Sequence, residues 1–513
     1  MNNENLYWLM ALASRRQHGA TVFERPGDEL NWTYQDLESL TGRLAGRLIS
    51  LDVEPGDRIL VQVEKSPEAV ALYLACLQVG AVFVPINTAY TDPEVDYFLL
   101  DAQPRLFVCS AAVGAADTSE IKARLPALND NCQVLTLSDS GGGSLLADLP
   151  DTPRSEICLR RGDDLAAILY TSGTTGRSKG AMLSHSNLAI SAVMLIDAWG
   201  WRSSDVLLHA LPIFHVHGLF VALHCALLTG TRMIFLASFN AEEMVAQLPR
   251  ATVMMGVPTF YTRMLGVAGL SQSASSNMRL FISGSAPLTE QTFAEWEART
   301  GHRILERYGM SETMMNTSNP LIGERVPGTV GFPLPGVLTR IADDEGRELA
   351  VGEVGTLEVK GPNVFSGYWR MPEKTAAEFR ADGFFITGDL ASQDAHGRIT
   401  LVGRAKDLVI SGGYNVYPKE LERLLDALPG VKESAVIGVP HEDFGEAVVA
   451  VLVAEAQPVA DAEVAAALDG QLARFKQPKK ICHVEELPRN AMGKVQKKQL
   501  RETFADLFSS GKS

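Results

Sequence analysis

Residues 171–180 bring together three residue types that suit a bound phosphate. The run 165–180 reads LAAILYTSGTTGRSKG, so an apolar segment leads into glycines, hydroxyl side chains and the cations Arg177 and Lys179. Glycine lets backbone N–H groups turn toward an anion, hydroxyls add hydrogen bonds, and cations offset phosphate charge. The spacing is not the Walker A pattern G-x-x-x-x-G-K-[ST], which disfavours a P-loop NTPase. We therefore predict a triphosphate-binding loop of another type, with a plain surface turn as the less favoured alternative.

Four further short motifs carry groups that suit a nucleotide. The first, Tyr308-Gly309-Met310-Ser311-Glu312-Thr313, supplies an aromatic face for a purine and a carboxylate oxygen for a hard cation such as Mg²⁺. The others are Thr387-Gly388-Asp389, Gly403-Arg404-Ala405-Lys406-Asp407 and Pro488-Arg489-Asn490-Ala491-Met492-Gly493-Lys494-Val495. Taken singly, the TGD triplet would be a turn, and Lys494 would be a solvated surface lysine like its neighbours.

In this order, the loop and the four motifs resemble the signatures of the adenylate-forming superfamily, which includes acyl-CoA synthetases, luciferases and the adenylation domains of peptide synthetases. The resemblance covers essentially the whole chain. It implies an enzyme that activates a carboxylic acid with ATP and Mg²⁺ as an acyl-adenylate. The ATP-binding residues that it implies are Thr171, Ser172, Gly173, Thr174, Thr175, Gly176, Lys179, Gly284, Ser285, Glu306, Arg307, Tyr308, Ser311, Asp389 and Arg404.

The resemblance also implies individual roles. Tyr308 would stack on adenine, and the Ser311 hydroxyl would contact the α-phosphate. The family usually has threonine at position 311, and because serine is less restrained at χ1, we expect the same role with looser geometry. The remaining implied roles are catalysis by Lys494, His215 and Glu312, Mg²⁺ binding by Glu312 and Thr171, ribose contacts from Asp389 and Arg404, a hinge at Lys406, and a CoA channel near Gly412 and Gly413.

A group of histidines lies between the loop and these motifs. His215-Val216-His217 follows His209 closely, so a metal site comes to mind, but the Cys/His spacing of zinc motifs is absent. The resemblance places His215 at the wall of the acyl pocket instead.

The charged residues expected near the acid limit its chemical class. Amino-acid adenylation domains generally carry an Asp for the α-ammonium, and Asn240 at the matching position is neutral, which counts against an amino acid. Arg263 falls where the family builds its acyl site, and a cation there suits a second carboxylate. An outward-facing Arg263 in a surface ion pair is an equal alternative. Arg279 is a weaker candidate.

Longer stretches at 210–220, 280–288, 306–320 and 361–375 resemble the malonyl-CoA synthetases within this superfamily. The resemblance implies an acid–thiol ligase that converts malonate with ATP and CoA to malonyl-CoA, with methylmalonate as an open alternative. It makes Arg263 the first candidate for the distal carboxylate of malonate. Three alternatives stay open: a synthetase for another small mono- or dicarboxylic acid, an adenylating enzyme that loads a carrier protein, and a nucleotide-binding regulator without catalysis. Related synthetases are switched off by acetylation at the position of Lys494, so a lysine acetyltransferase and deacetylase are conceivable partners.

The elements that must position these residues follow an alternating pattern. Short apolar runs predict strands at 58–63, 82–86, 105–108, 134–137, 164–170, 205–210, 232–236, 253–256 and 279–283. Helical patterns at 36–51, 68–79 and 219–228 separate several of them. This alternation predicts parallel-type sheets with helices on both faces. Residues 327–360 are rich in turns and short strands, which indicates a small β-barrel-like subdomain.

A last module begins near residue 404 and carries its own helices and strands. We expect an α/β fold in two domains: residues 1–403 with the ATP and acyl sites, and a mobile α+β lid of residues 404–513 with the catalytic lysine, joined at 404–407.

Composition excludes some functions. The chain of 513 residues has 46 Lys and Arg against 61 Asp and Glu, a charge of −15, which opposes binding to nucleic acid. The apolar stretches 69–85 and 219–239 are interrupted by polar residues and glycines, so we expect no membrane span. Six cysteines without CxxC pairs indicate reduced thiols, and the N-terminus lacks the order of a secretory signal. We expect a cytoplasmic enzyme of unknown oligomeric state.

Overall fold

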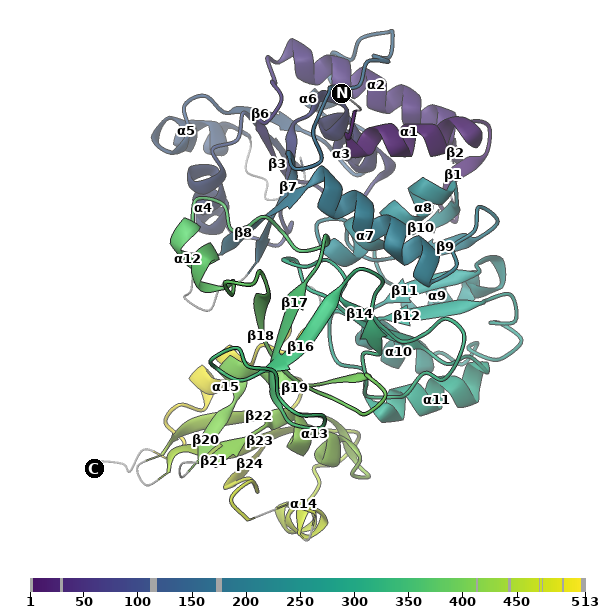
Figure 1. Ribbon diagram of the computed structural model, residues 1–513. Coiled ribbons are helices and arrows are strands. Elements are labelled where there is room, and N and C mark those ends of the chain that lie inside the picture. Colours follow the sequence, from purple (N-terminus) through teal and green to yellow (C-terminus); the bar gives the residue numbers. More distant parts are fainter. Residues whose placement is uncertain are drawn as a thin grey trace.

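The computed structural model describes residues 3–27, 31–110, 118–171, 178–411, 414–441, 444–469, 471–472, 474–490 and 493–508. These ranges form four β-sheets with helices packed around them (Figure 1). Two large sheets and most helices occupy the upper part of Figure 1, a smaller sheet follows below them, and the C-terminal sheet lies at the bottom.

The first large sheet has six strands in the order β6-β5-β3-β4-β7-β8. All neighbours are parallel except β7 and β8, which form an antiparallel pair that brackets the glycine-rich loop. Its strands are β3 (Arg58–Gln62), β4 (Val82–Pro85), β5 (Leu106–Cys109), β6 (Gln133–Thr136), β7 (Leu165–Thr171) and β8 (Lys179–Ser184). Its helices are α2 (Tyr34–Ser50), α3 (Pro67–Val79), α4 (Asp92–Ala102), α5 (Thr118–Leu128) and α6 (Ser144–Ala147).

The second large sheet has nine strands in the order β15-β14-β13-β12-β11-β9-β10-β1-β2. Its six central strands, from β13 to β1 in this order, run parallel to one another. Its strands are β1 (Thr21–Glu24), β2 (Asn31–Thr33), β9 (Val206–His209), β10 (Arg232–Phe235), β11 (Val253–Gly256), β12 (Leu280–Ser283), β13 (Leu305–Tyr308), β14 (Thr317–Ser318) and β15 (Phe332–Pro333). Its helices are α1 (Leu6–Arg16), α7 (His185–Ala198), the π-helix η1 (His217–Leu223), α8 (His224–Thr229), α9 (Ala241–Gln247), the 3₁₀ helix η2 (Leu248–Arg250), α10 (Pro258–Leu265) and α11 (Glu290–Thr300).

Two smaller sheets complete the chain. Four antiparallel strands follow the order β16-β17-β18-β19. Five C-terminal strands form a sheet in which β23 pairs with β20, β22 and β24. The first group comprises β16 (Leu338–Ala342), β17 (Gly355–Lys360), α12 (Pro372–Ala377), β18 (Phe385–Gln393) and β19 (Ile399–Arg404). The second comprises η3 (Ala405–Asp407), β20 (Val409–Ser411), β21 (Tyr414–Val416), α13 (Pro418–Asp426), β22 (Val431–His441), β23 (Gly445–Ala454), α14 (Asp461–Leu468), β24 (Lys480–Val484) and α15 (Lys497–Thr503).

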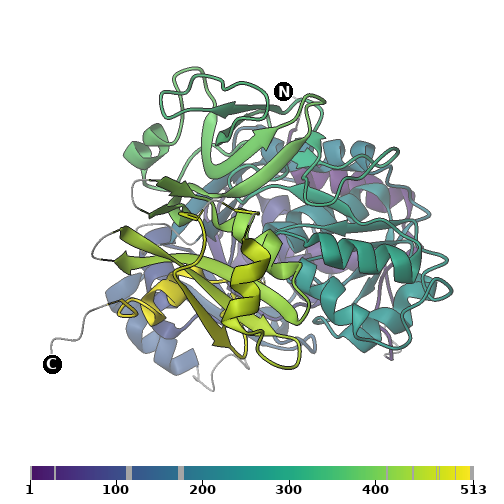
Figure 2. The same cartoon turned by 90° about the horizontal axis from the view of Figure 1, so that it is seen from below.

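The C-terminal sheet packs close to the large part of the chain, as the view from below shows (Figure 2). Arg423 on α13 lies 3.6 Å from Glu290 at the start of α11. The Cα of Gly493 lies so near Thr259 on α10 that an added Cβ would sit 2.9 Å from its hydroxyl. The loop that carries Lys494 is therefore held against α10.

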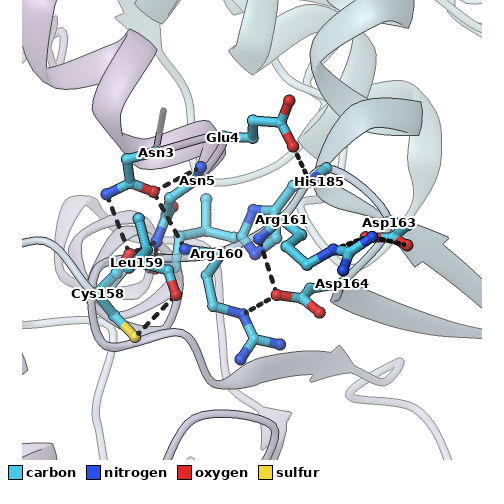
Figure 3. A network of polar contacts seen from close by, with 12 residues as sticks. Asn3, Glu4, Asn5, Cys158, Leu159, Arg160, Arg161, Asp163, Asp164 and His185 are labelled. Carbon is cyan, nitrogen blue, oxygen red and sulfur yellow. Dashed lines mark hydrogen bonds and ion pairs between the residues drawn. The ribbon is translucent and has the colours of Figure 1, made fainter. Parts of the chain in front are cut away.

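The segment that leads into β7 is tied to the N-terminus (Figure 3). The Asn5 side chain donates to the carbonyls of Leu77 and Cys158 at 2.7 and 3.1 Å, and the Arg160 N–H donates to Asn3. The His185 ring at the start of α7 accepts the Leu6 N–H at 3.1 Å. These polar contacts tie the segment before β7 and the start of α7, which follows β8, to the N-terminal residues 3–6.

The predicted α/β class with a large N-terminal and a smaller C-terminal part is confirmed. The subdomain expected at 327–360 is an antiparallel sheet that continues to residue 404, because β18 and β19 complete the pairing of β17. The helix expected at 219–228 begins with a π-helical turn at His217. No helix within the described ranges is long and apolar enough to cross a membrane.

Candidate active site

Three neighbouring parallel strands end at one edge of the nine-stranded sheet. Gly256 of β11 pairs with Ser283 of β12, which pairs with Glu306 of β13. Ligands of open α/β sheets bind beyond the carboxyl ends of the strands. The predicted residues Gly284, Ser285, Arg307 and Tyr308 therefore gather at the edge where a ligand is expected.

Tyr308, Asp389 and Arg404 form a buried polar cluster. The Tyr308 hydroxyl donates to Asp389 Oδ2 at 2.5 Å, and Arg404 Nε lies 2.8 Å from Asp389 Oδ1. Asp389 and Arg404 are direct partners across β18 and β19, so the antiparallel register brings two separate motifs together. Burial raises the pKa of Tyr308, and the Asp389 carboxylate raises the pKa of Arg404. The cluster presents oxygen and nitrogen groups of the kind that a ribose needs.

Glu306 offers a buried hydrogen-bond acceptor next to this cluster. Its Oε1 accepts the Leu288 N–H at 3.3 Å, whereas its Oε2 is buried and no described residue donates to it. Burial raises the pKa of Glu306 to about 7. A buried acceptor without a donor fits an amino group on a bound ring.

Thr171 and Glu312 come together as the prediction requires. The Thr171 hydroxyl donates to Glu312 Oε1 at 3.3 Å, and the Tyr368 hydroxyl lies 3.1 Å from the same oxygen. Burial raises the pKa of Glu312. The described residues contain no group of three or more His, Cys, Asp or Glu that could hold a metal by themselves. A hydroxyl and a carboxylate are, however, the hard oxygen donors that Mg²⁺ takes when phosphates supply further ligands.

Lys179 begins β8 and its side chain is only 10% exposed. Its ammonium lies 3.2 Å from Glu378 Oε1 and 4.1 Å from the centre of the Tyr368 ring. Burial alone would raise the pKa of Glu378, but hydrogen bonds from Lys374 and Tyr368 and the charge of Lys179 lower it. Tyr368 and Glu378 are thus part of this site, although the sequence analysis did not name them.

Lys494 lies in a tight turn of the C-terminal part of the chain, and this turn packs against α10 of the large domain. The Lys494 N–H donates to the Asn490 side chain at 2.9 Å, and Gly493 has a φ of 72°, a conformation that glycine adopts readily. Burial and the neighbouring charge of Arg404 lower the pKa of Lys494 to about 8. No described residue forms a hydrogen bond or ion pair with its ammonium, which leaves this cation available to a ligand.

The three histidines occupy different environments. His209 accepts from Lys65 at 2.8 Å and contacts the Gly218 carbonyl at 3.0 Å, so it is a packed core residue. His217 contacts the Ser285 hydroxyl at 3.3 Å. Burial and the nearby charges of Arg307 and Lys494 lower the pKa of His215 to about 4, which makes it a neutral imidazole beside two cations.

Arg307 is the most unusual charged residue of the site. It is 3% exposed, and no described residue accepts a hydrogen bond from its guanidinium; Nε and Nη2 are buried without any partner. The guanidinium packs against Gly284, where an added Cβ would sit 2.5 Å from Cζ, and its charge acts on His215 and His217. Burial lowers the pKa of Arg307 to about 9. An unpaired buried cation is costly, so this geometry suits an anionic ligand.

The two arginines expected to bind the acid lie elsewhere. Arg263 is exposed on α10, whose buried side chains include Tyr261 and Met264. Arg279 pairs with Asp205 at 2.5 Å just before β12, at the amino end of that strand, opposite the edge with the site. The prediction for Arg279 is therefore wrong, and the outward-facing alternative describes Arg263.

The remaining predicted residues lie in several different parts of the structure. Ser311 is half-buried beside Glu312, and Ser285 has a φ of 71°, unusual for a residue with a side chain. Asn240 is an exposed N-cap that accepts the Glu243 N–H, so its neutrality says little about the acid. Lys406 lies in η3, between the third sheet and the C-terminal one. Seven predicted ligands and channel residues lie outside the described ranges: Ser172, Gly173, Thr174, Thr175 and Gly176, with Gly412 and Gly413 in a second gap.

Comparisons with known proteins find relatives over most of the chain. A family model described as AMP-binding enzyme matches residues 11–369, and one described as AMP-binding enzyme C-terminal domain matches residues 420–494. A malonate–CoA ligase of Arabidopsis thaliana is 35% identical over 488 residues, covering 88% of this chain and 78% of the relative. A mitochondrial malonate–CoA ligase of Mus musculus is 37% identical over 472 residues, covering 84% of this chain and 78% of the relative.

A solved structure is similar over nearly the full length. The crystal structure of ATP-bound MatB from Rhodopseudomonas palustris has a TM-score of 0.95 at 51% identity, and the match covers 99% of this chain and 100% of that chain.

Proposed function

Since this chain belongs to the AMP-binding enzyme family, we propose that it is an ATP-dependent malonate–CoA ligase. Malonate and ATP form malonyl-adenylate and pyrophosphate, and CoA then takes the acyl group to give malonyl-CoA and AMP. The malonate–CoA ligases among its relatives support this acid, and the match to an ATP-bound structure supports the nucleotide.

The observation that carries the choice of acid is the unpaired guanidinium of Arg307. A monocarboxylic acid presents one carboxylate, which reacts with ATP and leaves Arg307 unpaired. A short diacid presents a second carboxylate, and arginine can bind a carboxylate through two parallel hydrogen bonds. His215, the neutral imidazole near Arg307 and Lys494, then lies between the ends of the acid. We therefore assign the distal carboxylate to Arg307 in place of Arg263.

In the first half-reaction a malonate oxygen forms a bond to the α-phosphorus, and the bond from that phosphorus to the pyrophosphate oxygen breaks. Two anions must approach one another, so the site has to offset repulsion. Lys494, held against α10 by its turn, supplies a cation without a competing partner. Positive groups arranged in advance stabilise the charge that develops in the transition state.

Mg²⁺ would be held by Glu312 and Thr171 together with the phosphates of ATP. When bound, it would neutralise phosphate charge and lower the barrier to transfer of the adenylyl group. Tyr308 would cover the adenine, Glu306 would accept from its amino group, and Asp389 would accept from the ribose hydroxyls, releasing its hydrogen bond from Tyr308.

The second half-reaction requires CoA to reach the adenylate. We propose that residues 404–407 are the hinge about which residues 404–513 rotate, removing Lys494 from the site. The exposed Lys406 in η3 supports a hinge at this point, and the exposed Arg423–Glu290 ion pair, 3.6 Å long, supports a lid that can separate. A cytoplasmic location, acetylation of Lys494 and a CoA channel at residues 412–413 remain predictions.

A pyrophosphate-release assay tests the proposal. The acids are malonate, methylmalonate, succinate, acetate and butyrate, each with and without CoA, and thioester formation is followed separately. We expect malonate to have the highest kcat/KM and to give malonyl-CoA. A preference for acetate or butyrate would reject the diacid, and adenylation without thioester formation from free CoA would favour a carrier-protein acceptor.

A further inference from the structure

The segment 366–369 pairs antiparallel with β8 through an isolated bridge between Tyr368 and Ala181. The Met182 N–H donates to the Gly367 carbonyl at 3.0 Å, and the Trp369 N–H donates to the Gly180 carbonyl at 2.8 Å. A Cβ at Gly180 would sit 2.8 Å from Ile168 and 3.3 Å from the Trp369 Cβ, so glycine permits this close approach. Backbone pairing thus brings Tyr368 to Lys179, which is far away in the sequence.

Glu378 is the anchor of Lys179 in this arrangement. It follows α12 and approaches the ammonium to 3.2 Å, and no other carboxylate of the described residues forms an ion pair with Lys179. A lysine side chain with 10% exposure needs such a partner, because a buried charge without one is strongly destabilising. The ammonium position therefore depends on Glu378.

Tyr368 links this pair to the proposed metal ligand. Its hydroxyl lies 2.6 Å from Glu378 Oε2 and 3.1 Å from Glu312 Oε1. A hydroxyl has one proton and can donate it to one carboxylate at a time. The shorter distance favours donation to Glu378, which leaves Glu312 Oε1 with only the weaker contact from Thr171 at 3.3 Å.

Lys374 gives Glu378 a second cation. Its ammonium lies 2.7 Å from Glu378 Oε1, on the outer side where Lys374 is 39% exposed. Glu378 therefore keeps a counter-ion when Lys179 turns toward a triphosphate. Lys374 also provides a matched control, because it binds the same oxygen but lies outside the site.

We propose that Glu378 and Tyr368 are positioning residues for ATP. Glu378 holds the Lys179 ammonium beside Glu312 and accepts the hydrogen bond of the Tyr368 hydroxyl, which keeps Glu312 Oε1 available to a metal–triphosphate complex. The inference rests on the ATP half of the proposed function and is independent of which acid is activated.

Calorimetric titration of the whole protein with ATP, in Mg²⁺ and in EDTA, tests the inference without turnover or acid. Glu378→Gln keeps the size of the side chain but loses its charge. We expect its Kd for MgATP to rise about tenfold, because Lys179 loses the charged partner that holds its ammonium. Lys374→Met should change Kd less than twofold. An equal loss in both variants would overturn the anchoring role.

Tyr368→Phe supplies the more specific test. In the Glu378→Gln protein the Tyr368 hydroxyl can donate to Glu312 instead. Adding Tyr368→Phe to that protein should therefore recover several-fold of the lost affinity for ATP in Mg²⁺ and none of it in EDTA. A further loss of affinity, or the same change in both buffers, would overturn the role of Tyr368. In a Lys179→Ala protein, Glu378→Gln should change the Kd for MgATP at most half as much as it does in the wild type. Full additivity of the two substitutions would refute the link to Lys179.

Discussion

Replacing Arg307 with methionine tests the assignment of the distal carboxylate. Methionine has a similar length, no charge and flexible packing, so it fills the buried space without leaving a cavity. The guanidinium has two nitrogens without any partner and lies at 3% exposure. On the proposed assignment, the second carboxylate of a bound diacid satisfies these nitrogens in the wild-type protein, and in the variant it meets an apolar wall.

The size of the effect follows from the two missing hydrogen bonds. Each hydrogen bond to a charged group contributes about 1.5–3 kcal/mol, and about 1.4 kcal/mol corresponds to a factor of ten. We therefore expect kcat/KM for malonate to fall at least about a hundredfold. The value for butyrate should stay the same or rise, because a methyl end suits the apolar wall.

The free protein gives an independent readout. Burial already lowers the pKa of Arg307 to about 9, so the folded state bears an uncompensated charge. Removing it should leave the thermal midpoint of the free variant unchanged or raise it, whereas an arginine with a structural ion pair would lower it on removal. Malonate with a non-hydrolysable ATP analogue should raise the midpoint of the wild type and not that of the variant.

Arg263→Ala is the matched control, because it removes the same charge from the exposed face of α10. We expect it to change kcat/KM for malonate less than threefold. Equal losses for malonate and butyrate in the Arg307 variant would show that the guanidinium supports the fold of the pocket. A larger malonate-specific loss in the Arg263 variant would restore the sequence-based assignment.

Three further predictions concern the lid. Lys494→Ala should abolish pyrophosphate release and leave thioester formation from supplied malonyl-adenylate largely intact; equal loss of both steps would exclude a role in adenylation alone. The pKa of Lys494, lowered to about 8 by burial and Arg404, means that the ammonium is charged below that pH and loses its proton above it. Adenylation should therefore decline above about pH 8 in a pH–rate profile, and an unchanged rate at pH 9 would contradict this. Lys406→Pro should slow the CoA step at least tenfold and spare pyrophosphate release, and unimpaired CoA transfer would argue against a hinge there.

Elements with strong local signals could be predicted from the sequence. The helix expected at 68–79 is observed at Pro67–Val79, because Ser66 caps its first turn and Gly80 ends it in a left-handed conformation. The strand expected at 82–86 follows at once as β4. The site motifs meet for a similar reason: Asp389 and Arg404 are brought together by an antiparallel pair, a local arrangement of neighbouring strands.

The helical period explains why Arg263 is exposed. Within α10 the buried residues Pro258, Tyr261 and Met264 recur every three positions. Successive helical residues turn by about 100°, so Arg263 lies about 200° from Tyr261 and faces away from the side that is packed. The position of Arg279 follows from the direction of β12. A residue at the start of a parallel strand lies at the edge of the sheet opposite the ligands.

Arg307 shows what pattern alone could not reveal. In the run LERY, successive side chains of β13 alternate between the two faces of the sheet, so sequence would place Leu305 and Arg307 on one face and a carboxylate on the other. Nothing in this pattern shows that both faces of the strand are covered. Nor does it show that Glu306 accepts a hydrogen bond from the Leu288 N–H and none from Arg307. Only the three-dimensional contacts reveal a guanidinium that is buried, pressed against Gly284 and without a partner. Since a protein gains no stability from such a group, its presence has to be explained by a ligand that brings the missing charge, and a short diacid does so while still offering a second carboxylate to ATP.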